Sequence, residues 1–183
     1  FFVLFHMYGN TKMFLGQKAF DEYAHHLRTM FEPILPYTGF LWLFRLSLIL
    51  AIVLHLWSAF TLWSRANSAR DVKYTAKSTV QRSLSSQWMR WGGVTLLLFI
   101  VWHLLQFTIV KFNINGAVSL DSMKIDGELS PYKLAVAAFQ VPWLTLIYLI
   151  ALLALALHIH HGTWSAMQTL GWTNTARARV TAK

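Results

Sequence analysis

Long apolar runs alternate with polar segments along the chain, and three of these runs are long enough to cross a membrane. A helix needs about 20 predominantly apolar residues to span the hydrocarbon core of a bilayer. The three runs cover residues 38–63, 91–112 and about 134–165. Pro142, within the third run, predicts either a kink near the start of that helix or its first turn. The pattern predicts an all-α fold, a transmembrane helix bundle.

A fourth apolar run, at about residues 1–14, is too short to span a bilayer. It opens in mid-pattern, with neither an initiator methionine nor the basic flank of a signal peptide. We therefore expect it to be the end of a truncated first helix. The polar C-terminal tail is expected to lead into a fifth helix that the fragment lacks. Residues 1–183 are then a single membrane-anchor domain.

The composition also favours a membrane protein. Hydrophobic residues make up 56% of the chain and charged residues only 13%, against about 25% charged residues in soluble domains. The absence of cysteine excludes disulfides, zinc–thiolate sites and cysteine-ligated iron–sulfur clusters within this chain. The net charge of +9 comes from residues between the apolar runs rather than along one face, which argues against a nucleic-acid partner.

The distribution of basic residues predicts the orientation in the lipid bilayer. The segment 64–90 is strongly basic and holds a single acid, Asp71, whereas the segments 15–37 and 111–133 mix both signs. Positive charge in short loops marks the cytoplasmic side. We expect a multi-pass membrane protein, with the basic loop and the C-terminal tail in the cytoplasm. The amphipathic loop 15–37 is then on the outer side.

Each of the four apolar runs contains a histidine, and polar groups at membrane depth usually face the bundle interior or a functional pathway. These histidines are His6, His55, His103 and His158. At 1.5 Å per helical residue, His103 lies roughly 20 Å from the inner boundary and His55 roughly 15 Å. Depth therefore sorts His6 with His103 in an outer pair, and His55 with His158 in an inner pair. Two facing histidines can ligate a haem iron, whereas four ligands at two depths cannot make one tetrahedral zinc site.

Small residues lie within a turn of three of these histidines, which leaves room for a porphyrin or serves plain helix packing. They are Gly9 near His6, Ala51 and Ala59 near His55, and Ala154 and Gly162 near His158. Phe99 and Phe107 take the corresponding places around His103.

Four stretches around these histidines resemble the dihaem cytochrome b membrane anchor of succinate:quinone oxidoreductases, in its single-subunit, five-helix form. The stretches are HMYGNTKMFLGQKAFDEYAHHLR, VLHLWSAFTLW, MRWGGVTLLLFIVWHLLQF and LHIHHGTWSAMQTLGW, in the order of the family. The resemblance implies two haem b groups. His6 and His103 would bind the haem farther from the catalytic subunits, and His55 and His158 the nearer one.

The resemblance also implies the partners of this subunit of succinate dehydrogenase (complex II). A flavoprotein that oxidises succinate to fumarate and an iron–sulfur protein would dock on the cytoplasmic side, where the chain is most basic. This non-catalytic subunit would pass electrons through the inner and outer haems to a quinone, and menaquinone is usual in dihaem members. It would link the tricarboxylic acid cycle to the respiratory chain.

Three further residues are candidates near the haems. Arg90 matches an arginine of relatives and would pair with a haem propionate or anchor the helix by snorkelling. Arg45 lies within a predicted span, where an unpaired charge costs about 2.5–3.5 kcal/mol. It would meet an outer-haem propionate, line a quinone pocket or snorkel outward. His161 is a competing ligand or propionate partner, whereas His160 is expected at the headgroup boundary.

The quinone site and its proton donor are not assigned by the sequence. Some fumarate-reducing relatives carry a carboxylate in the loop after the first helix, but this chain has Arg28 there, with Glu32 as the nearest acid. His25 matches a histidine of succinate-oxidising relatives or is an ordinary surface residue. Two other functions stay open: a haem-less structural anchor, and the dihaem subunit of a formate dehydrogenase or nitrate reductase.

Overall fold

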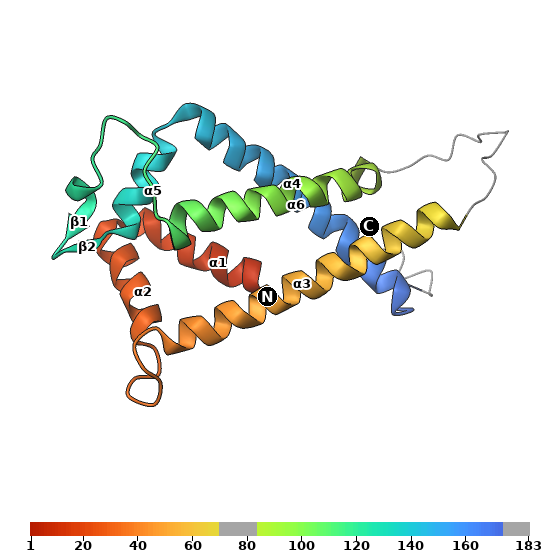
Figure 1. The fold of residues 1–183 in the computed structure, drawn as a ribbon, viewed down its shortest axis with the longest axis horizontal. Coiled ribbons are helices and arrows are strands. Elements are labelled where there is room, and N and C mark those ends of the chain that lie inside the picture. Colours follow the sequence, from red (N-terminus) through yellow and green to blue (C-terminus); the bar gives the residue numbers. More distant parts are fainter. Residues whose placement is uncertain (70–83, 174–183) are drawn as a thin grey trace. The chain divides into compact units, whose positions relative to one another are not determined.

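The computed structural model describes residues 1–69 and 84–173. It divides the chain into two compact units, Phe1–Thr79 and Val80–Lys183, and each unit is described by itself. The described residues are mostly helical (Figure 1). Most of the basic loop and the end of the C-terminal tail lie outside them, so the predicted orientation stays a prediction.

The first unit consists of three helices and a short 3₁₀ turn. They are α1 (Phe2–Thr11), the 3₁₀ turn η1 (Lys12–Leu15), α2 (Gln17–Thr29) and α3 (Gly39–Ser68). Between η1 and α2 the chain turns at Gly16, whose φ of 92° is accessible to glycine at little cost. The amphipathic segment predicted at 15–37 thus contains the helix α2.

The contact between α1 and α2 corrects the interpretation of Gly9. A Cβ on Gly9 would lie 2.8 Å from Cε1 of Tyr23, and the Tyr23 ring also meets Tyr8 edge-on with centroids 6.3 Å apart. Gly9 is buried by this contact. The space that we expected for a porphyrin near His6 is therefore filled by Tyr23, and Gly9 serves helix packing.

The second unit begins with α4 (Leu84–Leu104), which ends in a π-helical turn, η2 (Leu105–Ile109). A 3₁₀ turn and an antiparallel hairpin follow, and two helices then end the described chain. These elements are η3 (Asp121–Met123), β1 (Lys124–Ile125), β2 (Glu128–Leu129), α5 (Pro131–Phe139) and α6 (Pro142–Thr169).

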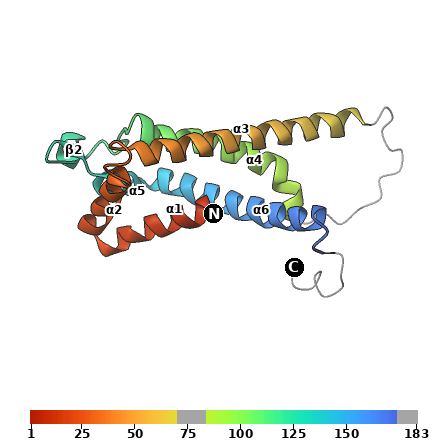
Figure 2. The same cartoon turned by 90° about the horizontal axis from the view of Figure 1, so that it is seen from below.

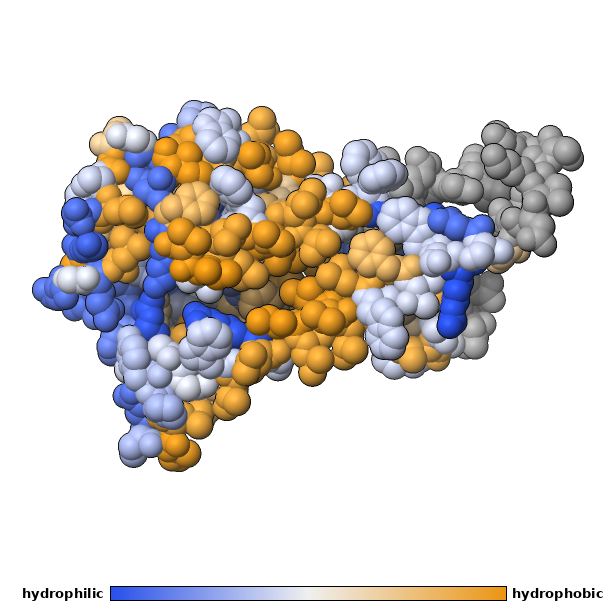
Figure 3. All heavy atoms as spheres, viewed as in Figure 1, coloured by the Kyte–Doolittle hydropathy of each residue, from blue (hydrophilic) through white to orange (hydrophobic). Residues whose placement is uncertain are grey.

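Three helices are long and apolar enough to cross a membrane, and they coincide with the three predicted spans. They are Gly39–Ser68, Trp88–Ile109 and Pro142–Thr169. Many of their apolar side chains are exposed, and the space-filling view shows extended apolar surface (Figure 3). Lipid is the environment in which such a surface is stable. The structure thus confirms that the predicted runs form helices that are long and apolar enough to span a membrane.

The predicted helix at about 134–165 is two helices rather than one. α5 ends at Phe139, Val141 adopts an extended conformation with φ −91° and ψ 108°, and Pro142 begins α6. Proline disfavours helical backbone in the residue before it, while its own fixed φ suits the first turn of a helix. Of the two roles expected for Pro142, the first-turn role is the correct one.

α4 and α6 pack antiparallel, in one constant register. As the residue number rises along α4, the number of its neighbour falls equally along α6. The contacts pair Met89 with Gly162, Gly93 with His158, and His103 with Tyr148. Toward one end of this helix pair, α5 and the segment 110–130 add a small core around Met123, Leu134 and Leu144.

The N-terminus of α5 provides a test of this packing. The buried Ser130 Oγ accepts a hydrogen bond from the backbone N–H of Lys133 at 3.2 Å, and Pro131 takes the first helical position. We expect Ser130→Ala to cost about 1 kcal/mol, the usual value of such a cap. Thermal denaturation in detergent should show a midpoint lower by a few degrees, whereas the exposed Ser165→Ala should leave it unchanged. Equal midpoints for the two variants would contradict the capping role.

Candidate haem-ligand histidines

The structure places the four predicted ligands on four separate helices, two in each unit. His6 lies on α1, His55 on α3, His103 on α4 and His158 on α6. Among the described residues, no three histidine or acidic side chains gather closely enough to hold a metal ion.

The two histidines of the second unit lie at different levels of the helix pair. His158 faces Gly93, which precedes His103 by ten residues on α4. Ten helical residues span roughly 15 Å. Because a metal–imidazole bond is only about 2 Å long, His103 and His158 cannot ligate the same ion. This agrees with their assignment to different depths.

The first unit shows a comparable separation. Phe2 of α1 meets Phe44 of α3 with ring centroids 6.0 Å apart, and the two helices run in opposite senses (Figure 2). His6 follows Phe2 by one turn, while His55 follows Phe44 by three turns in the other direction. At 1.5 Å per residue, the two histidines are separated by on the order of 20 Å. They too cannot share a metal ion.

Each predicted pair takes one histidine from each unit. The pairing of His6 with His103, and of His55 with His158, therefore rests on the predicted depths and on the family resemblance. It stays a prediction.

Aromatic rings surround His103. Its imidazole is half-buried, with the ring centroids of Phe99 and Phe107 at 5.9 and 5.5 Å and that of Tyr148 at 6.0 Å. The two phenylalanines lie one turn to either side on the same helix, as the sequence predicts. The hydroxyl of Tyr148 adds a polar group to this aromatic setting.

That hydroxyl belongs to a buried polar network that the sequence analysis missed. Tyr148 Oη lies 3.3 Å from Nδ1 of His103 and donates a hydrogen bond of 3.0 Å to Oε1 of Gln106. The same Oε1 accepts a 3.0 Å hydrogen bond from Nε1 of Trp102. Gln106 is fully buried in the π-helical turn η2. A glutamine in the apolar run 91–112 was the signal that could have directed attention to it.

Gly93 of α4 contacts His158 of α6, about ten residues along the helix pair from His103. A Cβ on Gly93 would lie 3.5 Å from Cε1 of His158, so the residue that makes room for this imidazole is on the neighbouring helix. Gly162, which we expected to provide that room, faces Met89. His161 is half-buried and His160 is exposed, so of these two His161 is the nearer to a site within the protein.

The two arginines differ in what the structure shows. The Arg45 guanidinium lies over the ring of Trp42, 5.3 Å from the ring centroid. Trp42 precedes Arg45 by about one helical turn, so the Arg45 side chain is directed toward the N-terminus of α3. This contact is compatible with the snorkelling predicted for Arg45, and its three expected roles stay open. Arg90 is exposed on α4, and both of its expected roles stay open.

The loop residues that we considered for the quinone site are His25, Arg28 and Glu32. His25 and Glu32 are exposed, and Arg28 is half-buried. The backbone carbonyl of Arg28 accepts a 2.7 Å hydrogen bond from the N–H of Thr38, which closes the loop before α3. No catalytic role follows from these positions.

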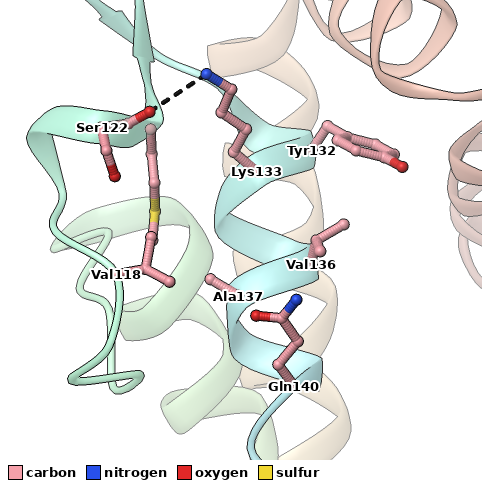
Figure 4. Close-up of a pocket in the computed structure, with 8 residues that line it drawn as sticks. Val118, Ser122, Tyr132, Lys133, Val136, Ala137 and Gln140 are labelled. Carbon is pink, nitrogen blue, oxygen red and sulfur yellow. Dashed lines mark hydrogen bonds between the residues drawn. The ribbon is translucent and has the colours of Figure 1, made fainter.

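A shallow pocket of about 200 Å³ lies between α5 and the segment 118–123 of the second unit (Figure 4). The Lys133 ammonium donates a 3.2 Å hydrogen bond to the Ser122 carbonyl oxygen at the edge of the pocket.

Near the pocket, the Lys124 ammonium lies 2.8 Å from the Asp121 carboxylate. The hydrogen bond and the positive charge of Lys124 lower the pKa of the Asp121 carboxyl group. None of the predicted site residues lines the pocket, whose volume is below the roughly 300–1,000 Å³ of typical ligand pockets. We therefore do not assign the quinone to it.

No family model, curated protein or solved structure matches the chain. The functional assignment thus depends on the residues themselves and on the resemblance of the four histidine-containing stretches.

Proposed function

We propose that the chain is the dihaem cytochrome b anchor of a succinate:quinone oxidoreductase of the bacterial inner membrane. One observation carries the proposal: four histidines lie on four separate helices, and in each unit the two histidines are too far apart to share a metal ion. One outer and one inner haem, each held by two imidazoles, would use all four. His6 and His103 are the proposed outer ligands, and His55 and His158 the inner ones.

The chemistry of the second unit fits such a group. The imidazole of His103 lies among aromatic rings with a hydroxyl beside Nδ1, and the imidazole of His158 lies against a glycine that adds no bulk. Histidines that bind metal commonly engage a hydrogen-bond partner through the other ring nitrogen. A haem bound between two imidazoles supplies a one-electron carrier whose iron alternates between the ferric and ferrous states.

The remaining residues receive roles consistent with these positions. The four imidazoles would hold the two haem groups, while Arg90 and His161 are the proposed partners of inner-haem propionates. The basic loop attracts the iron–sulfur and flavoprotein subunits on the cytoplasmic side. The quinone, for which we propose menaquinone, would accept electrons near the outer level.

Electron transfer in the intact complex tests this function. We expect the membrane complex, purified with its two soluble partners, to reduce a menaquinone analogue with electrons from succinate. Formate should give no reduction, because the proposed flavoprotein oxidises succinate. A complex that contains haem but responds to formate would assign the chain to another oxidoreductase. A complex without b-type haem would indicate a purely structural anchor.

A further inference from the structure

The donor and acceptor roles in the hydrogen-bond network around His103 can be assigned, because the Trp102 side chain can only donate a hydrogen bond. The indole Nε1–H has no acceptor capacity, so the side-chain atom of Gln106 that faces it must be the oxygen. The same oxygen accepts the hydroxyl proton of Tyr148. With its proton directed to Gln106, the Tyr148 oxygen presents a lone pair to Nδ1 of His103, 3.3 Å away. The geometry thus favours the tautomer of His103 with a proton on Nδ1.

The polar side chains of this network are buried or half-buried between apolar helices, which lowers the stability of the fold. Gln106 is fully buried, and its Nε2 has no hydrogen-bond partner among the described residues. A buried amide group that is left partly without hydrogen bonds destabilises a fold. The surrounding turn is π-helical, with the N–H groups of Val110 and Lys111 both directed to the carbonyl of Leu105. Such turns occur frequently at functional sites.

We propose that Tyr148 and Gln106 are positioning residues for the outer haem, holding His103 with Nδ1 as donor and Nε2 as the iron-binding nitrogen. This inference rests on the proposed dihaem function. A hydrogen bond from Nδ1–H makes the imidazole a more basic ligand, and a more basic ligand favours the ferric state. The bond from Tyr148 to Gln106 strengthens the effect, because linked hydrogen bonds polarise one another.

Tyr148→Phe tests the proposal with a change of a single oxygen. We expect the ratio of ferrous to ferric outer haem at a fixed potential to rise about three- to tenfold, the size of one net hydrogen bond. For a one-electron couple this corresponds to a midpoint potential higher by about 28–59 mV. Redox titration of the purified complex measures it. The inner haem is the internal reference, and the outer haem is identified as the one that His6→Ala removes.

A second variant keeps the test decisive if Tyr148→Phe fails to retain haem. Gln106→Leu leaves the Tyr148 hydroxyl beside His103 but removes its acceptor, so we expect a smaller rise of the outer potential alone. The exposed Tyr37→Phe is the matched control and should shift neither potential. An unchanged outer potential in every variant that binds haem, or equal shifts of both haems, would overturn the proposal. Absence of b-type haem from the wild-type complex would instead overturn the proposed function.

Discussion

Replacement of His158 by alanine should remove about half of the haem from the purified complex and leave the other half spectrally unchanged. A b-type haem has no covalent link between its porphyrin and the protein, so the loss of one histidine ligand should weaken haem binding at that centre alone. His103 lies roughly 15 Å away along the helix pair and keeps its own environment. Haem content per chain and the redox titration of the remaining haem are the measurements.

His161→Ala is the matched control, because it removes an imidazole from the same helix three residues farther on. Since we assign the iron to His158, the His161 variant should keep both haems and at most shift the inner potential through a lost propionate contact. If His161→Ala loses the haem and His158→Ala retains it, the ligand is His161. Retention of both haems by both variants would exclude an inner haem ligand in this segment.

Gly93→Leu should have an effect almost as large, although Gly93 itself binds nothing in our account. A Cβ at this position lies 3.5 Å from Cε1 of His158, so the outer carbons of a leucine meet the imidazole. Overpacking of this kind destabilises a fold by about 1–3 kcal/mol. A displaced imidazole ring would in addition be poorly oriented for binding the iron. We expect the inner haem to bind at least about tenfold more weakly, for which 1.4 kcal/mol suffices. Haem content after washing with detergent would show it.

Gly93→Ala separates this steric effect from the loss of a flexible residue. Its Cβ makes only an ordinary van der Waals contact with His158 at 3.5 Å, and alanine favours the helix. This variant should therefore keep both haems. A Gly93→Leu variant that also keeps both would show that the contact between α4 and α6 does not position the inner ligand.

The membrane spans could be predicted from the sequence because they depend only on length and apolar composition. The three predicted runs match the three helices, and the main error concerned the third run, which proved to be two helices separated just before Pro142. Hydropathy does not reveal the break between α5 and α6, since both helices are apolar. The local effect of proline on the residue before it decides the matter.

The contacts between helices could not be predicted, because spacing within a helix does not reveal what lies opposite. Gly9 and Gly162 are close to histidines in the sequence, yet they face Tyr23 and Met89. Gly93 was not considered because it is on another helix from His158. Tyr148 was missed for the same reason, since it meets His103 only through the register of α4 and α6.

The central claim, that this chain binds two b-type haems, is tested most directly by one spectrum. The dithionite-reduced minus oxidised absorption spectrum of the purified wild-type complex should show b-type bands, with a haem content of two per chain. Two haems per chain are the number that two pairs of histidine ligands would hold. A complex that is intact but shows no b-type band would contradict the account.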